Sequence, residues 1–461
     1  MSYFRHSIEL SLRENIIFPF YWKYIRKSNV LKYYHELRAH QWNSLEENKK
    51  IQRKKLFKLI KYASQNIPYY QNMINEYNIK FSEDNIFDDI EKFPILSKEI
   101  IRNNFDKLYK FRDKFYYLNT TGGSTGKPVT LYQDGEYYGW AAANKILMNK
   151  WAGRGVGVPM IKLWGSLRDI LGSGHGFITG YLREKFSGIT ILNSDRMSEN
   201  DLYDYVRKIN QIKPVLILAF TNSIDELARF IQKYNLSVYS PPAVMTTAGV
   251  LYPEVRARII DVFHASVFNR YGSQEVSDIA CNCEKNEGLH LNSDIHYLEI
   301  VDDEGKKVDT DKPGNIIITL LTNYTMPLIR YKIEDRGVLS KKACSCGRGL
   351  PLLGKVEGRI RENFKNKFGE HINGGVFIDL FYFENKVKQF QIIQEEVDYI
   401  IINLVLTEKK KIQNTNQYFK KINQKICKIM GHALKIEYKI VAEINPSPSG
   451  KFLYYFSKVA D

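Results

Sequence analysis

The sequence predicts an α/β protein with a large N-terminal domain built on parallel sheets and a small α+β C-terminal domain. Three observations predict this fold class. Between residues 215 and 269, short apolar strands alternate with amphipathic helices, which is typical of a parallel sheet. After Ile295, strands separated by turn residues indicate a β-rich part of the same domain. After Arg359, two alternating strands flank one helix, as in a small separate unit.

Apolar periodicity gives the elements of the large domain. A helix is expected over 48–65, because Leu56, Leu59 and Ile60 fall on one helical face. The further expected elements are strands over 215–220, 243–247, 266–269, 298–301, 315–321 and 338–339, and helices over 222–234 and 254–263. Ligands of parallel sheets bind at the carboxyl ends of strands, and Tyr271-Gly272-Ser273 lies at one such end.

The small domain is expected to hold strands over 398–406 and 434–441 around a helix over 415–429. The polar, charged stretch over 362–368 is typical of a linker. The predicted domains are a basic, aromatic helical extension over 1–60, a large domain over 61–360 whose β-rich part spans about 280–360, and a small domain over 361–461.

Composition excludes a disordered chain and favours a folded protein of more than one domain. Apolar residues make up 44% of the 461 residues and aromatic residues 13%. The sequence contains no run of about 18 apolar residues and no signal-peptide core, so a cytoplasmic location is expected.

Positive charge is concentrated near the N-terminus. The formal net charge is +16, and residues 1–60 carry 13 Lys and Arg against 5 Glu, interleaved with aromatic residues. This pattern suits peripheral contact with the inner membrane face, an acidic polymer or nucleic acid. A packed helical extension is the other interpretation. No recognised nucleic-acid-binding motif occurs, so no nucleic-acid partner is expected.

Residues 119–128 read Asn-Thr-Thr-Gly-Gly-Ser-Thr-Gly-Lys-Pro and form the most informative stretch of the chain. Glycines let backbone N–H groups converge on an anion, hydroxyls donate further hydrogen bonds and lysine adds charge. The P-loop pattern does not fit, because the glycine spacing is one residue short and Pro128 replaces Ser or Thr. A phosphate-binding loop of another kind and a plain solvent-exposed loop both stay open on this stretch alone.

Five segments together resemble the adenylate-forming superfamily of acyl- and aryl-CoA ligases. They stand in the order expected, at 119–128, 269–275 (NRYGSQE), 326–335 (MPLIRYKIED), 358–359 (GR) and 449–452 (SGKF). Within the superfamily the chain looks like the phenylacetate-CoA ligase group and its capsular polysaccharide biosynthesis branch. Two further stretches also resemble this branch, 66–70 (NIPYY) and 93–98 (FPILSK).

The resemblance implies ATP and Mg²⁺ as cofactors and a role for each matching residue. Glu275 would bind Mg²⁺, Tyr271 would stack near adenine, and Asp335 would accept hydrogen bonds from the ribose hydroxyls. Gly272 would leave room for the acyl group, and Arg359 would assist ribose or phosphate binding. The implied phosphate-binding and nucleotide-binding residues are Thr120, Thr121, Gly122, Gly123, Ser124, Thr125, Gly126, Lys127 and Ser273.

Lys451 is the implied catalytic lysine of the small domain. Such a lysine can approach the charge that develops between the acyl oxygen and the α-phosphate, and it leaves when the domain rotates. The hinge for this motion would lie around 361–363. Taken without the other segments, Lys451 would be an exposed lysine in a Pro- and Ser-rich turn.

Two departures from the family pattern concern the substrate. Glu334 replaces the glycine that normally precedes Asp335, and Gly249 stands where relatives often carry glutamate. The acyl pocket would be lined by Phe220, Thr221, Gly249 and Trp164, although ordinary packing explains these residues equally well.

Four cysteines and one histidine form a possible metal site. Cys281 and Cys283, then His290, then Cys344 and Cys346 offer five soft ligands, whereas tetrahedral zinc needs four. The preferred set is Cys283, His290, Cys344 and Cys346, with Cys281 as an alternative ligand. Reduced, packed thiols are the other interpretation.

Two functional hypotheses follow. The first is an ATP-dependent ligase that activates a small-molecule carboxylate as an acyl-adenylate and transfers it to CoA or another thiol, or to an amine acceptor, as in capsule biosynthesis. The second is a non-catalytic nucleotide- or polyanion-binding protein docked to a membrane by its basic N-terminus. The first is favoured by the joint retention of Lys127, Glu275, Asp335, Arg359 and Lys451.

Overall fold

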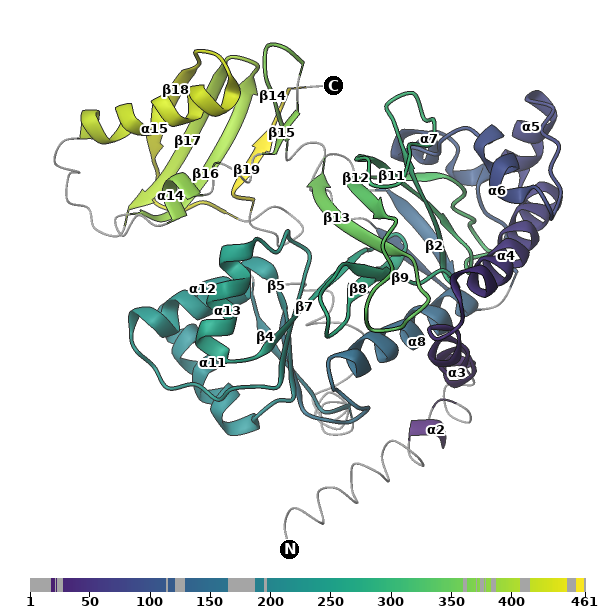
Figure 1. The fold of residues 1–461 in the computed structure, drawn as a ribbon, viewed down its shortest axis with the longest axis horizontal. Coiled ribbons are helices and arrows are strands. Elements are labelled where there is room, and N and C mark those ends of the chain that lie inside the picture. The colour runs from purple at the N-terminus through teal and green to yellow at the C-terminus, as the bar shows by residue number, and fades with distance from the viewer. Residues whose placement is uncertain are drawn as a thin grey trace, which may run out of the picture. The chain divides into compact units, whose positions relative to one another are not determined.

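The computed structural model divides the chain into two compact units, each with a sheet of its own (Figure 1). The first unit comprises Met1–Gly123 and Lys127–Val356, and the second comprises Ser124–Gly126 and Glu357–Asp461. The described residues are 18–20, 22, 28–112, 115–120, 129–164, 187–194, 197–359, 363–369, 371–373, 377, 379–382, 387–406, 415–445 and 453–459.

An eleven-stranded sheet forms the frame of the first unit, in the order β10-β11-β12-β13-β9-β8-β7-β6-β5-β3-β4. Its strands are β3 (Met160–Trp164), β4 (Ile189–Asn193), β5 (Leu216–Phe220), β6 (Ala243–Thr247), β7 (Ser266–Ser273), β8 (Ser277–Asn282), β9 (Leu289–Leu291), β10 (His296–Val301), β11 (Gly314–Leu320), β12 (Tyr331–Ser340) and β13 (Leu352–Arg359). The predicted combination of a parallel part and a β-rich part is confirmed.

Strand β7 joins the two parts of this sheet. Its first half pairs in parallel with β6 as far as Asn269, and its second half pairs antiparallel with β8 from Arg270 onward. The expected strand over 266–269 therefore continues to Ser273. Tyr271, Gly272 and Ser273 lie just past the carboxyl end of the parallel pairing, which is where ligands of such sheets collect.

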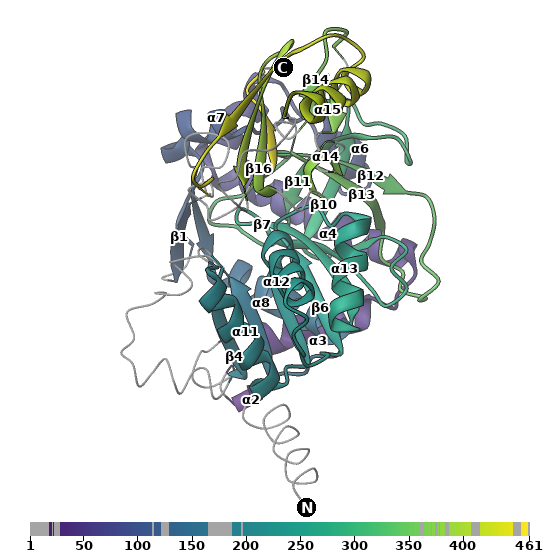
Figure 2. The same ribbon diagram turned by 90° about the vertical axis from the view of Figure 1, so that its left-hand side faces the viewer.

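Helices cover both faces of the parallel strands. Figure 2 shows α11 (Glu199–Ile212), α12 (Thr221–Lys233) and α13 (Pro253–Phe263) side by side over one face. The end of α8 (Gly135–Trp151) covers the other face, where Met148 packs with Leu216, Leu218 and Met245. Because side chains alternate along a strand, Leu216 and Leu218 point to the same side. The helices expected over 222–234 and 254–263 are confirmed as α12 and α13.

The N-terminal helices belong to the main core of the first unit. They are α2 (Phe18–Phe20), α3 (Val30–His40), α4 (Leu45–Asn66), α5 (Pro68–Glu76), α6 (Ile86–Asp89), η3 (Ile90–Lys92), α7 (Lys98–Asn103) and η4 (Phe105–Lys107). A capping box between Ser44 and Glu47 starts α4, and Leu56, Leu59 and Ile60 on its inner face are fully buried. In the described part of residues 1–60, the packed interpretation of the basic segment therefore applies.

A separate two-stranded sheet, β1 (Tyr116–Thr120) with β2 (Thr130–Asp134), carries the glycine-rich segment as its connecting loop. Thr120 pairs with Thr130, so both ends of the loop are placed next to each other. Asp134 secures the far end of β2, because its carboxylate accepts hydrogen bonds from the backbone N–H groups of Tyr324 and Thr325 at 3.0 Å each.

The second unit contains a four-stranded sheet in the order β18-β17-β16-β19. Its elements are β14 (Asn363–Lys365), β15 (His371–Asn373), α14 (Asp379–Tyr382), β16 (Val387–Glu396), β17 (Tyr399–Leu406), α15 (Thr415–Met430), β18 (Lys435–Ile440) and β19 (Tyr455–Ser457). The strand–helix–strand prediction is confirmed, whereas β16 and β19 were not predicted. None of the described helices is long and apolar enough to cross a membrane.

Candidate active site and metal centre

A tight hairpin places Glu275 at the junction of the two parts of the large sheet. Ser273 pairs with Ser277, so three residues form the turn, and Ser277 has the positive φ of 63° that this kind of hairpin requires. Gly272 is needed for packing here, because a Cβ atom would lie 2.6 Å from the Ser277 carbonyl oxygen. The sequence had suggested that Gly272 leaves room for the acyl group, and the structure adds this backbone contact as a reason for glycine.

Glu275 is buried in this turn, and among the described residues its carboxylate bonds to Tyr331. The side chain is 4% exposed, and the hydroxyl of the fully buried Tyr331 donates to its Oε1 atom at 3.1 Å. Tyr331 is the first residue of β12. A hydrogen bond of this kind orients the carboxylate, and carboxylate oxygens are ligands that suit a hard cation such as Mg²⁺. Sequence reasoning missed Tyr331, although it lies inside the 326–335 segment.

The start of β12 is held by the 93–98 segment, the second of the subsidiary stretches. Leu96 makes two backbone hydrogen bonds, one on each side of Tyr331. The Leu96 N–H donates to the Arg330 carbonyl at 2.9 Å, and the Lys332 N–H donates to the Leu96 carbonyl at 3.0 Å. The Arg330 guanidinium is buried, donates to the Phe93 carbonyl at 2.9 Å and pairs with Glu299 at 3.2 Å. This support fixes the backbone position from which Tyr331 reaches Glu275.

Tyr271 and Asp335 form a second pair of a tyrosine and a carboxylate. The Tyr271 hydroxyl donates to Asp335 Oδ2 at 2.7 Å, and Asp335 is 9% exposed. Glu334, which replaces the family's glycine, keeps a positive φ of 69° and pairs with Lys98 at 2.6 Å. The position therefore retains the backbone conformation that favours glycine, and the ion pair with Lys98 offsets part of the conformational cost.

The Ser273 hydroxyl provides a further group for a polar ligand. Its oxygen is buried and has no hydrogen-bond partner within the described part of the chain. Buried hydroxyls normally have a partner, so an oxygen-rich ligand such as a phosphate fits this position. Glu275, Asp335 and Ser273 thus form a donor and acceptor set that suits a magnesium-bound nucleotide.

The four expected pocket residues lie at the carboxyl ends of adjacent parallel strands. Trp164 ends β3 and Phe220 ends β5, and their ring centroids are 4.4 Å apart. Thr221 begins α12 directly after Phe220, and its hydroxyl donates to the Gly249 carbonyl at 3.2 Å. A Cβ atom on Gly249 would lie 3.2 Å from the Thr221 Cβ atom, so a glutamate at this position would require Thr221 to move.

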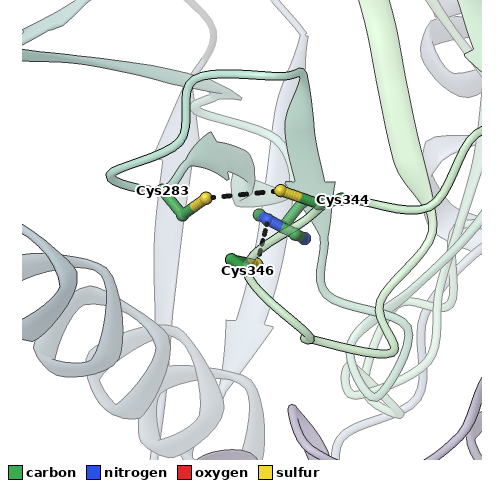
Figure 3. Close-up of side chains that lie close together, drawn as sticks. Cys283, Cys344 and Cys346 are labelled. Atoms are coloured by element: carbon green, nitrogen blue, oxygen red, sulfur yellow. Dashed lines mark hydrogen bonds between the residues drawn. The ribbon is translucent and has the colours of Figure 1, made fainter.

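The preferred metal-binding set converges at the other end of the antiparallel strands (Figure 3). One potential ligand atom from each of Cys283, His290, Cys344 and Cys346 lies within 4.8 Å of the other three. The Cys283 and Cys344 sulfur atoms are 3.6 Å apart, and Cys346 Sγ lies 3.4 Å from His290 Nε2. A zinc tetrahedron with Zn–S bonds of about 2.3 Å has edges of roughly 3.8 Å, so the observed separations fit zinc.

The surroundings of these side chains also suit a metal. Burial is the main cause that lowers the pKa of His290 to about 4, which leaves the imidazole neutral and able to bind a cation. The backbone N–H groups of Lys285 and Arg348 donate to Cys283 Sγ and Cys346 Sγ at 3.4 Å each. Cys281 lies apart from the cluster, packed in the core beneath α8, where burial raises its pKa to about 12.

Comparison with known proteins gives relatives that cover most of the chain. The family model described as the CapK C-terminal domain matches residues 361–458. The chain is 23% identical to the protein CapK of Staphylococcus aureus over 453 residues, covering 95% of each chain. It is 24% identical to a phenylacetate-coenzyme A ligase of Thermus thermophilus over 333 residues, covering 68% of this chain and 71% of that protein.

The fold has a solved counterpart of similar extent. A crystal structure of 2-hydroxyisobutyryl-CoA ligase in the postadenylation state, in complex with R3-HIB-AMP, matches with a TM-score of 0.69 and 17% identity, covering 91% of each chain. Along most of its length the chain is similar to CapK and to phenylacetate-coenzyme A ligases, and it shares the fold of adenylate-forming ligases. Its large sheet and its small α+β unit are those of an adenylate-forming ligase fold.

Several site residues expected of an adenylate-forming ligase lie outside the described residues. These are Thr121, Gly122, Gly123, Ser124, Thr125, Gly126, Lys127 and Lys451. Thr120 is described as the last residue of β1, and Arg359 is described by its backbone alone, as the last residue of β13. The roles of all these residues stay predictions.

Proposed function

We propose that the protein uses ATP to activate a small-molecule carboxylic acid as an acyl-adenylate and then transfers the acyl group to CoA or to an amine acceptor. The observation that carries this proposal is the pairing of Glu275 with Tyr331 and of Asp335 with Tyr271 at the junction in the large sheet. Two buried carboxylates, each held by a tyrosine hydroxyl, offer separate sites for a cation and for ribose hydroxyls.

The chemistry explains why such residues are required. When a carboxylate attacks the α-phosphorus, negative charge builds on phosphate oxygens and pyrophosphate leaves, so the site must neutralise charge and hold the reacting groups in line. Mg²⁺ on Glu275 would supply positive charge next to the phosphates. Asp335 would orient the ribose, Ser273 would donate to a phosphate oxygen, and Lys127 and Lys451 would add positive charge.

The acceptor and the biological role belong to the same proposal. An acyl-adenylate reacts with a thiolate or with an amine, and similarity to a phenylacetate-coenzyme A ligase supports CoA. Similarity to CapK along 95% of the chain supports a role in surface or capsular polysaccharide biosynthesis. We propose a cytoplasmic location, with the part of the basic N-terminal segment that precedes α3 as a contact for the inner membrane face.

Carboxylate-dependent exchange of labelled pyrophosphate into ATP tests the first half-reaction directly. A panel of carboxylic acids should contain at least one that drives exchange, and CoA or amines added afterwards should yield a thioester or an amide detectable by mass. ATP binding without exchange across the panel would contradict the proposal and support the non-catalytic hypothesis.

The Lys451→Ala variant should lower the exchange rate by about 10²- to 10³-fold, because the charge on the transferring group loses its partner. Lys458→Ala is the matched control. Lys458 lies in the same unit and pairs with Glu395 at 2.7 Å, so its loss should leave exchange unchanged. Exchange at the wild-type rate in Lys451→Ala would refute the role of this lysine.

A further inference from the structure

Two side-chain amides join the β1–β2 hairpin to the turn that carries Glu275. Asn119 Nδ2 donates to the Gln274 carbonyl at 2.9 Å, and Gln133 Nε2 donates to the carbonyls of Gln274 and Glu275 at 3.2 and 3.0 Å. The two amides also bond to each other, from Asn119 Nδ2 to Gln133 Oε1 at 3.1 Å. We call Asn119 and Gln133 the amide pair.

Asn119 lies at the end of the hairpin from which the glycine-rich segment starts, whereas Gln133 lies next to Asp134 and pairs with Tyr117 across the hairpin. Asn119 is one residue before the last residue of β1, and Thr120 is paired with Thr130 across the hairpin. Gln133 is 1% exposed, so its hydrogen bonds are shielded from water. In such a setting a lost hydrogen bond leaves buried carbonyl groups without a donor.

These bonds matter because the hairpin is not part of the large sheet. β1 and β2 form a two-stranded sheet of their own, which is marginally stable without outside support. Asp134 attaches β2 to residues 324 and 325, and the amide pair attaches both strands to residues 274 and 275. The orientation of the hairpin therefore depends on both attachments.

We propose that Asn119 and Gln133 are positioning residues for the adenylation step, because they fix the strand end before the glycine-rich segment relative to Glu275. This inference rests on the function proposed above. The phosphates and the cation bound to them have to be held at the same time, by the loop after Thr120 and by Glu275 respectively. A displacement of about 1 Å between reacting groups can lower a rate about 10²-fold.

The test compares Gln133→Leu and Asn119→Leu with Gln52→Leu. Gln52 is a comparable buried amide, because its Nε2 atom donates to the carbonyls of Ser293 and His296 at 3.2 and 2.8 Å and not to those of residues 274 and 275. Pyrophosphate exchange is measured for each variant while the concentrations of Mg²⁺, ATP and carboxylic acid are varied separately, and melting temperatures are recorded.

We expect Gln133→Leu to raise the apparent constants for Mg²⁺ and ATP at least tenfold and to change the constant for the carboxylic acid less than twofold. Asn119→Leu should raise the constants for Mg²⁺ and ATP by a smaller factor, again with little change in the constant for the carboxylic acid. This variant tests the inference if Gln133→Leu does not fold. The double variant should be no worse than Gln133→Leu, because the two amides act together. Gln52→Leu should lower the melting temperature without raising the constants for Mg²⁺ and ATP relative to the constant for the carboxylic acid.

Two results would overturn the inference, and they differ. If the wild-type protein catalyses exchange but the amide-pair variants behave like Gln52→Leu, Asn119 and Gln133 have a structural role alone and the proposed function stands. If the wild-type protein catalyses no exchange with any acid, the proposed function fails and the inference fails with it.

Discussion

At the scale of single residues, the site depends on backbone positions that only particular residues can occupy. Gly272 lies opposite the Ser277–Asp278 backbone, and Glu334 keeps the left-handed conformation in which its family carries glycine. The first position excludes any side chain. The second accepts one at a conformational cost, which the ion pair with Lys98 partly offsets.

Gly272→Ala should destabilise the first unit by roughly 1–3 kcal/mol, because the new Cβ atom would lie 2.6 Å from the Ser277 carbonyl oxygen and 2.8 Å from the Asp278 Cα atom. Urea unfolding measures the change. Gly354→Ala is the control, since its Cβ atom would meet its nearest neighbour at 3.6 Å. Equal stability of the two variants would show that the hairpin tolerates a side chain at residue 272.

At the scale of elements, polar contacts attach the N-terminal helices to the large sheet. His40 at the end of α3 and Lys55 in α4 both bond to the carboxylate of the buried Asp294, at 3.0 and 2.6 Å. Gln52 of α4 adds hydrogen bonds to the backbone on either side of the same turn. These contacts explain why the basic segment is part of the core from α3 onward.

The contact between His40 and Asp294 should make stability depend on pH. The hydrogen bond that His40 donates to the Asp294 carboxylate raises the pKa of His40 above its ordinary value of 6.5, and burial opposes this shift. A raised folded-state pKa contributes stability that is complete below about pH 6.5 and is lost as the pH rises through the folded-state value.

Urea unfolding across this pH range should show the free energy of unfolding of the wild type falling by roughly 0.5–1 kcal/mol as His40 deprotonates. His40→Gln should lack this decrease. His35→Gln, an exposed histidine of the same helix, should retain it. An identical pH profile for His40→Gln and the wild type would mean that the contact contributes nothing to the pH dependence.

At the scale of the whole first unit, the cysteine–histidine cluster links parts of the chain that are far apart in sequence. Arg348 follows Cys346, and its Nε atom donates to Gln41 Oε1 at 3.0 Å between α3 and α4. Trp151, at the end of α8, donates to the same oxygen at 2.9 Å and stands edge-on to His290. A bound zinc ion would therefore stabilise the packing contacts among β9, the end of α8 and the turn between α3 and α4.

Purified protein should contain one equivalent of zinc, and a chelator should lower its melting temperature. A site filled at roughly 1,000-fold above its dissociation constant contributes about 4 kcal/mol to the stability of the folded state. Hydrogen exchange should then increase at residues 41–44 and 344–349. Cys344→Ser should lose the metal, whereas Cys427→Ser should retain it. A metal-free preparation that melts at the same temperature with and without added zinc would contradict this assignment.

Much of the fold could be predicted from local patterns. The strands over 215–220 and 243–247 and the helices over 222–234 and 415–429 have clear apolar periodicity, and each appears in the structure within one or two residues. Strand β16 was missed because polar residues occupy many of its positions, such as Lys388, Gln389 and Gln394. Tertiary pairing with β17 and β19 makes it a strand.

The sequence by itself determined the fold class, the order of the motif segments and the kind of chemistry they serve. Each motif is a short run of residues, and the chemistry of its side chains indicates its function without the rest of the fold. The tertiary structure decided which side chains support them. Tyr331 with Glu275, Gln133 with the Glu275 carbonyl, and the separation of Cys281 from the other cysteines all depend on contacts between distant segments. Such contacts arise from strand order and packing, which no local spacing encodes.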